Sequence, residues 1–353
     1  MRHVPRAPGP APAPPLGVTV EVLAFGVQAD ERPLIEEAFS GRHELHCTDV
    51  FLGADTAPMA AGYEAVSTSV NARLDARVLQ TLAVGGTSMI AQRSTGFNNI
   101  DLDVAERLGL TVARVSYYSP YSVAEFAWTL AMAVNRRIVR AGNRTRDFDF
   151  RLDGLMGRDL RGRTVGVIGT GKIGEAFTRI AHGFGMRLLG WDIAPNPACE
   201  ALGMEYATKE ELLAESDVVS LHVPLVPATH HLLDAAALRA MKDDAILVNS
   251  SRGGLVDTDA LVAELRRGRF SGVGLDVYEA EAGLFFLDKS VEGIDDDTLA
   301  RLVTFPRVVV TSHQAYYTRE AVTQIAETTA RNVDDYVAGR RGENVLVPAA
   351  PTA

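Results

Sequence analysis

The stretch "VGVIGTGKIGEAF", residues 165–177, decides the fold that the sequence predicts. It places Gly169, Gly171 and Gly174 in the spacing G-x-G-x-x-G. An apolar strand pattern precedes the glycines, a helical pattern follows them, and the next strand pattern ends at Asp192. Glycines at these positions let backbone amides approach a pyrophosphate at the N-terminus of a helix. The stretch therefore predicts a βαβ unit that binds a dinucleotide, and the alternative is an α/β turn without a ligand.

Asp192 indicates which dinucleotide is bound. A carboxylate at the end of the second strand can accept hydrogen bonds from the hydroxyl groups of the adenosine ribose. The same negative charge repels a 2′-phosphate. We therefore expect NAD rather than NADP.

Strand and helix patterns alternate on both sides of this unit, which predicts an α/β fold with parallel sheets. A first series begins with the strand pattern "VTVEVLAF" at residues 18–25, and a second begins at Thr164. The strand patterns of the second series are "TVGVIG", "MRLLGWD", "DVVSLHVP", "AILVNSS", "GVGLDV" and "RVVVTSH". A last helical pattern, residues 318–337, follows the completed second series, so we expect it to pack on the first domain.

The longest helical pattern covers residues 118–147, "YSPYSVAEFAWTLAMAVNRRIVRAGNRTRD". Ser119 can cap this helix, and Pro120 suits its first position. The spacing predicts one long helix that bridges two domains or lies at a subunit interface. A shorter helix is predicted after "TKEE", residues 208–211, which has the form of a capping box.

Length, charge and cysteine content exclude several classes of protein. A chain of 353 residues suits two domains. A formal net charge of −10 argues against nucleic acids and anionic membranes as partners. Cys47 and Cys199 provide neither a disulfide framework nor metal-ligand spacing, so we expect no metal site. We expect the protein to be located in the reducing cytoplasm. We expect residues 1–17, which are rich in proline, to form a disordered tail, and we expect no membrane span.

Two side chains that follow strand patterns could carry chemistry. Arg252 follows "AILV", and a guanidinium can bind a carboxylate through two hydrogen bonds. His313 follows "RVVV", and histidine can exchange a proton near neutral pH. The alternatives are a surface arginine and a structural histidine. His222 also follows a strand pattern, and we expect it to line the cofactor cleft in a structural role.

A catalytic histidine needs a carboxylate to orient it, and "GLDVYEAEAGLFF", residues 274–286, offers Asp276, Glu279 and Glu281. All three follow a strand pattern of the second series. Carboxyl ends of parallel strands meet at one edge of a sheet, where ligands bind. The residues alone leave open which acid serves the histidine.

These motifs resemble those of the NAD-dependent D-2-hydroxyacid dehydrogenases, and within them most closely the bacterial fermentative D-lactate dehydrogenases. The resemblance covers residues 18–345. It rests on "RSTGFNNIDLDVAERLGL", "YSPYSVAEFA", "TVGVIGTGKIG", "LHVPL", "VNSSRGGLVDT", "GLDVYEAEAGLFFLDKS" and "SHQAYYT". "LFFLDKS" is the stretch that points to the lactate branch.

The resemblance implies functions for individual residues. Arg252 matches the arginine that binds the substrate carboxylate, His313 the proton donor, and Glu281 the acid that orients it. Asp276 matches the aspartate that contacts the nicotinamide carboxamide. The other implied cofactor contacts are Gly169, Gly171, Lys172, Ile173, Gly174, Asp192, Val223, Pro224, Thr229, Ser250 and Ser251. The implied substrate contacts, besides Arg252, are Ser94, Thr95, Gly96, Tyr118 and Tyr316.

The family fold implies two Rossmann-like domains. A flavodoxin-like substrate domain would comprise residues 18–117 and 317–353, and an NAD domain residues 118–316, in a homodimer. The expected reaction is the NADH-dependent reduction of pyruvate to D-lactate. Tyr316 stands where lactate enzymes often carry phenylalanine, which keeps a bulkier 2-keto acid open as the substrate. An NAD-sensing corepressor-like protein is a less favoured alternative, and a methyltransferase is disfavoured by the downstream motifs.

Overall fold

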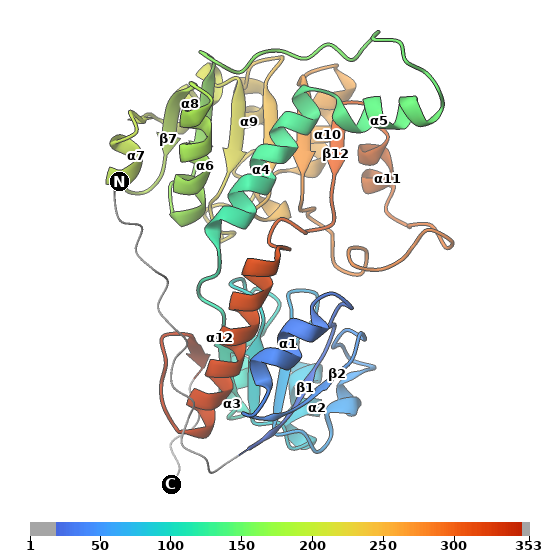
Figure 1. The fold of residues 1–353 in the computed structure, drawn as a ribbon, viewed down its shortest axis with the longest axis vertical. Helices are drawn as coiled ribbons and strands as arrows, with labels where there is room; N and C mark the ends of the chain where they lie inside the picture. Colours follow the sequence, from blue (N-terminus) through green and yellow to red (C-terminus); the bar gives the residue numbers. More distant parts are fainter. Residues whose placement is uncertain (1–18, 348–353) are drawn as a thin grey trace. The chain divides into compact units, whose positions relative to one another are not determined.

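The computed structural model describes residues 19–347, so the tail expected over residues 1–17 lies outside the described residues. The chain divides into two compact units (Figure 1). The first unit combines Met1–Tyr118 with Arg319–Ala353, and the second is Ser119–Thr318. No helix within residues 19–347 has the length and apolarity needed to cross a membrane.

The first unit is built on one sheet with the strand order β13-β5-β4-β3-β1-β2. The five strands from the first half of the chain are parallel and follow the flavodoxin-like order 2-1-3-4-5. They are β1 (Glu21–Ala24), β2 (Glu44–Cys47), β3 (Ala65–Thr68), β4 (Met89–Gln92) and β5 (Thr111–Arg114). The helices are α1 (Arg32–Phe39), η1 (Ala57–Ala60), α2 (Ala76–Val84), α3 (Leu102–Arg107) and α12 (Arg319–Val337).

The sheet of the first unit departs from the all-parallel prediction at one edge. Strand β13 (Val345–Val347) pairs with β5 in the antiparallel direction. The chain returns to this edge after α12, and an antiparallel strand at the edge of an otherwise parallel sheet is common in α/β folds.

Helix α12 packs against α1 and β4 within the first unit, as the sequence predicts for the last helix. Its buried face includes Ala326, Ala330 and Val333, which share a core cluster with Ile35 and Phe39 of α1. The two ends of the described chain therefore build one domain.

The second unit is built on a parallel sheet with the order β12-β11-β10-β9-β6-β7-β8. The strands β8-β7-β6-β9-β10-β11 have the doubly wound Rossmann order 3-2-1-4-5-6, and β12 adds one more strand at the edge, which confirms the predicted fold class. The strands are β6 (Thr164–Ile168), β7 (Arg187–Trp191), β8 (Glu205–Tyr206), β9 (Val218–Leu221), β10 (Ile246–Asn249), β11 (Gly272–Leu275) and β12 (Val308–Val310).

Two core clusters cover the two faces of this sheet. One packs α8 (Lys209–Glu215), α9 (Ala235–Ala240), α10 (Thr258–Arg266) and α11 (Asp297–Val303) against it. The other packs α4 (Pro120–Asn135), α6 (Lys172–Gly183) and α7 (Pro197–Glu200). A 3₁₀ helix, η2 (Gly253–Leu255), follows β10. Both faces are buried, so the strands read as continuous apolar runs.

The predicted long helix over residues 118–147 is wrong as a single helix. The structure divides it into α4 and α5 (Ile138–Arg146), because Arg137 adopts a left-handed φ of 56°. The Arg137 guanidinium donates hydrogen bonds to the carbonyl oxygens of Val134 and Ser271. The Asn135 side chain donates to the carbonyl oxygen of Arg158. These tertiary bonds break a segment that local propensity would continue.

The two predicted helix caps have different outcomes. Thr208 and Glu211 form a reciprocal capping box at the start of α8, as predicted. Ser119 occupies the position before α4, but its side chain makes no capping hydrogen bond. The predicted cap at Ser119 is therefore wrong, and only the proline at the first helical position holds.

Candidate active site

The predicted site residues of the second unit all follow the carboxyl ends of its parallel strands. Gly169 follows β6, Asp192 follows β7, and Val223 follows β9. Ser250, Ser251 and Arg252 follow β10, Asp276 follows β11, and His313 follows β12. Since parallel strands end at the same edge, one edge of one sheet carries the candidate site.

The glycine loop has the close contacts that the fingerprint requires. Gly169 has a φ of 92°, and a Cβ atom there would lie 2.7 Å from the carbonyl carbon of His222. A Cβ atom on Gly174 would lie 1.9 Å from the carbonyl oxygen of Gly169. A Cβ atom on Gly171 would meet nothing within 4 Å. The first and third glycines therefore build the turn, whereas the second faces open space at the N-terminus of α6, where Lys172 and Ile173 begin the helix.

Asp192 lies against the glycine loop. Its Oδ2 accepts a hydrogen bond of 2.6 Å from the backbone N–H of Thr170, and its Oδ1 accepts one from Ile193. The Tyr206 hydroxyl donates to Thr170 Oγ1 at 2.8 Å. This support from Tyr206 could not be predicted, because β8 is only two residues long and has no strand pattern of its own. The contacts hold the Asp192 carboxylate at the carboxyl edge beside the glycines.

Buried polar atoms without partners mark the same edge. Within residues 19–347, His222 Nδ1 and Ser250 Oγ are buried and have no hydrogen-bond partner. His222 Nε2 contacts Ser220 Oγ at 2.9 Å, and its ring packs 4.9 Å from that of Phe177. Burial lowers the pKa of His222 to about 3, so this histidine is neutral near neutral pH. Unpaired polar atoms beside an open glycine loop fit an edge that binds a polar cofactor.

Further predicted cofactor residues lie between β9 and η2. Ser251 Oγ donates to the carbonyl oxygen of Val223 at 2.6 Å, which links the ends of β9 and β10. Thr229 Oγ1 donates to the carbonyl oxygen of Pro224 at 2.6 Å. These bonds order the loops that border the glycine turn.

Arg252 lies in a turn that Asn249 fixes. The buried Asn249 side chain donates to the carbonyl oxygen of Arg252 at 2.8 Å and accepts a bond from the backbone N–H of Ser251. The Arg252 guanidinium donates a hydrogen bond of 2.6 Å to the carbonyl oxygen of Ser251. Asn249 is not among the predicted site residues, although a polar residue at the end of an apolar strand pattern is a usable signal. The guanidinium makes no ion pair within the described residues, which leaves its charge for an anion.

His313 forms a pair with Glu281. His313 Nδ1 lies 2.8 Å from Glu281 Oε1, and the two side chains are 13% and 26% exposed. Glu281 Oε2 accepts a hydrogen bond of 3.0 Å from the backbone N–H of Tyr278. His313 has a left-handed φ of 54°, which is uncommon for a residue other than glycine and is often found at functional sites. The structure therefore holds one ring nitrogen of His313 against a carboxylate.

Asp276 is fully buried and binds the turn that carries His313. Its carboxylate accepts hydrogen bonds from Thr311 Oγ1 and from the backbone N–H groups of Gln314 and Ala315. Burial raises the pKa of Asp276, although these hydrogen bonds oppose the shift. In this structure its hydrogen bonds are therefore with the protein, and they position the histidine turn.

Glu279 has other partners. Its Oε1 lies 2.6 Å from His231 Nε2, and its Oε2 accepts from Thr258 Oγ1. Of the three acids between residues 276 and 281, the structure places only Glu281 against the His313 ring.

The predicted substrate residues are divided between the units. Within the first unit, the Ser94 hydroxyl donates to the carbonyl oxygen of Gly96 at 2.6 Å, and Arg114 donates to the carbonyl oxygen of Thr95. Tyr118 is the last residue of that unit's first segment. Tyr316 belongs to the second unit, is half-buried and packs edge-on against Tyr317.

A sheet edge that carries a glycine loop for a dinucleotide and a histidine paired with a carboxylate is typical of the oxidoreductases that use nicotinamide cofactors. The guanidinium of Arg252 on the same edge suits a substrate that carries a carboxylate.

Comparison with known proteins narrows this class. The family model described as "D-isomer specific 2-hydroxyacid dehydrogenase, NAD binding domain" matches residues 128–315. The chain is 48% identical over 304 residues to the D-lactate dehydrogenase kk1H of Curvularia clavata, covering 86% of this chain and 87% of the relative. It is 47% identical over 320 residues to the D-lactate dehydrogenase of Escherichia coli, covering 91% and 97%.

A solved structure agrees with these sequences. The D-lactate dehydrogenase of Aquifex aeolicus, complexed with NAD and lactic acid, has a TM-score of 0.81 and 34% identity, covering 94% of this chain and 100% of that one. The chain belongs to the D-isomer-specific 2-hydroxyacid dehydrogenases. It is an NAD-dependent oxidoreductase, and its second unit contains the NAD-binding domain.

Proposed function

We propose that this protein is a D-lactate dehydrogenase, which reduces pyruvate to D-lactate with NADH. The observation that carries the proposal is the His313–Glu281 pair on the same sheet edge as Arg252 and the glycine loop. The names of the relatives from Curvularia clavata and Escherichia coli support it.

The proposed mechanism divides the chemistry among three side chains. NADH, when bound, supplies a hydride for the carbonyl carbon of the substrate. Arg252 binds the substrate carboxylate with its planar guanidinium and draws electron density from the neighbouring carbonyl. His313 donates a proton from Nε2 to the forming alkoxide oxygen. The Glu281 carboxylate contacts Nδ1 of His313 and stabilises the protonated form of the ring, which must be present before each proton transfer.

We also propose the cofactor contacts that family resemblance implies. Gly171 faces open space at the start of α6, which suits the pyrophosphate, and Asp192 suits the adenosine ribose. Family resemblance also proposes Asp276, whose side chain is fully buried in this structure, as the contact for the nicotinamide carboxamide. The remaining proposed contacts are Gly169, Lys172, Ile173, Gly174, Val223, Pro224, Thr229, Ser250 and Ser251.

The first unit is the proposed substrate-binding domain. The backbone N–H groups of Ser94, Thr95 and Gly96 would contact the substrate carboxylate, and Tyr118 and Tyr316 would line the pocket. The proposed domain ranges are 18–117 with 317–353 for substrate and 118–316 for NAD. Because a hydride must be shielded from water, the two domains should close during turnover.

A kinetic panel tests the proposed substrate and cofactor together. The purified protein is assayed with NADH and with NADPH against pyruvate and a series of bulkier 2-keto acids. We expect the highest kcat/KM for pyruvate with NADH, because Asp192 repels the phosphate of NADPH. A higher value for a branched or aromatic keto acid would favour the second candidate, which the Tyr316 hydroxyl motivates. Equal values for NADH and NADPH would contradict the proposed function of Asp192.

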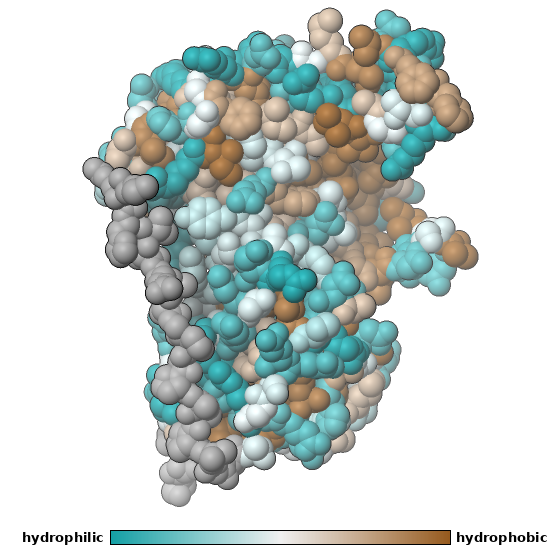
Figure 2. Space-filling model, viewed as in Figure 1, coloured by the Kyte–Doolittle hydropathy of each residue, from teal (hydrophilic) through white to brown (hydrophobic). Residues whose placement is uncertain are grey.

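A homodimer is the proposed assembly. Four apolar side chains just after α5 are between 71% and 89% exposed: Phe148, Phe150, Leu152 and Met156. Figure 2 shows apolar side chains gathered on the second unit around α5. Clustered apolar exposure of this kind is typical of protein–protein interfaces.

Sedimentation velocity checks the assembly. Phe148→Asp with Phe150→Asp should convert the dimer to a monomer, whereas Ile193→Asp, which changes a fully exposed side chain elsewhere, should not. The proposed location is the cytoplasm, because both Cys47 and Cys199 are free and the reaction draws on a pool of NADH.

A further inference from the structure

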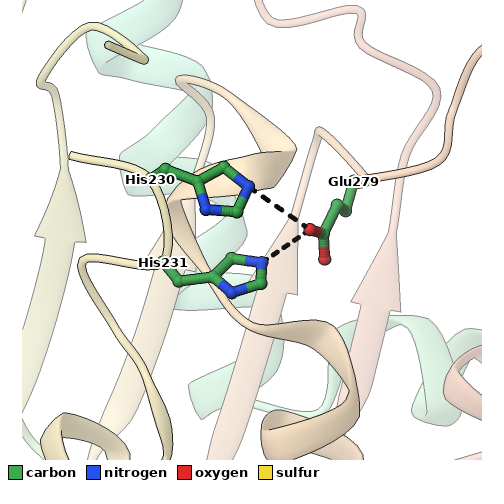
Figure 3. Close-up of side chains that lie close together, drawn as sticks. All are labelled: His230, His231 and Glu279. Atoms are coloured by element: carbon green, nitrogen blue, oxygen red, sulfur yellow. Dashed lines mark hydrogen bonds and ion pairs between the residues drawn. The ribbon is translucent and has the colours of Figure 1, made fainter. Parts of the chain in front are cut away.

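A second group of histidine and carboxylate side chains lies apart from the His313–Glu281 pair. His230 and His231 follow β9 in the chain, and Glu279 follows β11. Their ligand atoms lie within 4.8 Å of one another, and no other such group of three occurs in residues 19–347. Figure 3 shows the two imidazole rings side by side, facing the same carboxylate.

Both histidines approach the same oxygen atom. The Nε2 atom of His231 lies 2.6 Å from Glu279 Oε1, and the Nε2 atom of His230 lies 3.9 Å from it. The two rings stack with centroids 4.0 Å apart and an angle of 26° between their planes. His231 alone would be enough for the contact with Glu279. The His230 imidazole is therefore an additional nitrogen that could bind a metal ion.

The backbone explains why neighbouring residues present their rings together. Successive side chains of an extended segment point in opposite directions. His231 instead has a left-handed φ of 50°, which turns the chain between the two residues. The backbone N–H of His231 donates to the carbonyl oxygen of Gly254, and Leu233 pairs with Val256. The segment that carries both rings is therefore fixed to the chain that follows β10.

The carboxylate is oriented as well. Thr258 is buried, and its hydroxyl donates to Glu279 Oε2 at 3.2 Å. This hydrogen bond directs the other oxygen, Oε1, toward the two imidazoles. Supporting hydrogen bonds of this kind are typical of carboxylates that bind metal ions.

We propose that His230, His231 and Glu279 form a binding site for a divalent transition-metal ion, with Zn²⁺ as the best match. A set of two imidazole nitrogens and one carboxylate oxygen binds Zn²⁺, Ni²⁺ and Cu²⁺ in preference to Mg²⁺ and Ca²⁺, which favour oxygen ligands. The ion replaces the His231–Glu279 hydrogen bond and is held by Nε2 of each histidine and by Oε1.

The distances to Glu279 are near those of a zinc site, and the exposed His230 ring must rotate out of its stack on His231 so that both Nε2 lone pairs point at one ion. Donor atoms around a tetrahedral Zn²⁺ with bonds of about 2.1 Å lie roughly 3.4 Å apart. The two contacts to Glu279 Oε1, at 2.6 and 3.9 Å, lie on either side of this value. His230 is 55% exposed and the other two side chains are 33% exposed, so an ion can enter and water can complete its coordination.

The test uses the full-length chain without an oligohistidine tag, titrated with Zn²⁺ in a calorimeter and with Co²⁺ in a spectrophotometer. We expect one saturable site per chain and a Co²⁺ spectrum of tetrahedral type. His230→Asn and Glu279→Gln should each weaken Zn²⁺ binding at least about tenfold. At a Zn²⁺ concentration near a hundred times Kd, the Tm of the wild-type protein should rise by about 5 °C.

His46→Asn is the matched control. His46 and Glu44 form another histidine–carboxylate pair at 3.8 Å, next to Cys47 but without a second imidazole. This variant should bind Zn²⁺ like the wild type. The proposal is overturned if wild-type protein has no saturable site, or if His46→Asn removes binding. It is also overturned if His230→Asn, folded by the criterion of its metal-free Tm, binds as tightly as the wild type.

Discussion

Glu279 and Glu281 lie two residues apart in the chain but have different partners at the scale of the single residue. Glu281 contacts His313 at 2.8 Å, and Glu279 contacts His231 at 2.6 Å. Their partners lie 32 and 48 residues away in the chain. The residues alone could not decide between these acids, since both follow the same strand and nothing in their spacing identifies a distant partner. Family resemblance made the choice, and the geometry now gives it a physical reason.

Glu281→Gln should lower kcat/KM for pyruvate by at least about tenfold, since the neutral amide no longer stabilises a protonated His313. The measurement is steady-state kinetics in buffer treated with a chelator. Glu279→Gln removes the same charge from the same loop, so it separates a general charge effect from a specific one. A larger fall for Glu279→Gln than for Glu281→Gln would show that the wrong acid has been chosen.

Arg252→Lys should lower kcat/KM for pyruvate by about a hundredfold or more. An ammonium group cannot reproduce the planar, two-pronged contact with a carboxylate, and a lost contact of this type costs at least ~3 kcal/mol. The Kd for NADH, measured by fluorescence titration, should stay within about threefold. Arg266→Lys, at the exposed end of α10, serves as the control. A variant at Arg252 with nearly normal kinetics would mean that another cation binds the substrate.

His222 should make the stability of the protein depend on pH. Its pKa is about 3 in the folded protein, against an ordinary value of 6.5. Between these two values the unfolded chain binds a proton that the folded protein does not bind. The contribution is therefore fully present above about pH 6.5 and is lost as the pH falls toward 3.

Urea unfolding at pH 7 and pH 5 measures this effect. The wild-type protein should lose about 2 kcal/mol of unfolding free energy through His222 over this interval. His222→Gln can still contact Ser220 but cannot titrate, so its loss should be smaller by about that amount. Equal losses in the two proteins would contradict a neutral, buried His222.

At the scale of the element, two glycines in the turn between β6 and α6 have different functions: Gly174 is needed for the fold of the turn, and Gly171 for the proposed binding of the cofactor. Gly174 has no room for a Cβ atom, which would lie 1.9 Å from a carbonyl oxygen, whereas Gly171 has open space. Gly174→Ala should therefore lower the Tm by about 5 °C or more, because the turn must open. Gly171→Ala should leave the Tm within about 2 °C and weaken NADH binding at least tenfold, because the added methyl group occupies the space proposed for the pyrophosphate.

Differential scanning calorimetry and NADH titration of both variants check this division. If Gly171→Ala binds NADH like the wild type, the pyrophosphate lies elsewhere.

The elements also show where local sequence patterns stop being informative. The strands of the second unit other than β8 follow from their apolar runs, and the capping box of α8 follows from Thr208 and Glu211. The break between α4 and α5 could not be predicted, because the residues around Arg137 include neither proline nor glycine at the break. Its causes are hydrogen bonds to Ser271 and Arg158, which are distant in the chain.

At the scale of the whole molecule, the order of motifs was enough to predict that the last helix, α12, packs on elements from the first part of the chain. The last helix, α12, follows the final strand of the second parallel series, so we expected it to pack on the first unit. The antiparallel strand β13 was missed, because three residues give no periodic pattern. The His230–His231–Glu279 group could not be predicted, because Glu279 lies 48 residues from His231 in the chain and only folding brings the three side chains together.

The measurement that tests the central claim most directly is chiral analysis of the product. The purified protein is incubated with pyruvate and NADH, and the lactate is separated by chiral chromatography while NADH oxidation is followed by absorbance. A family member that uses Arg252, His313 and Glu281 as proposed should form one D-lactate for each NADH oxidised. Formation of L-lactate, or NADH oxidation without lactate, would contradict the account.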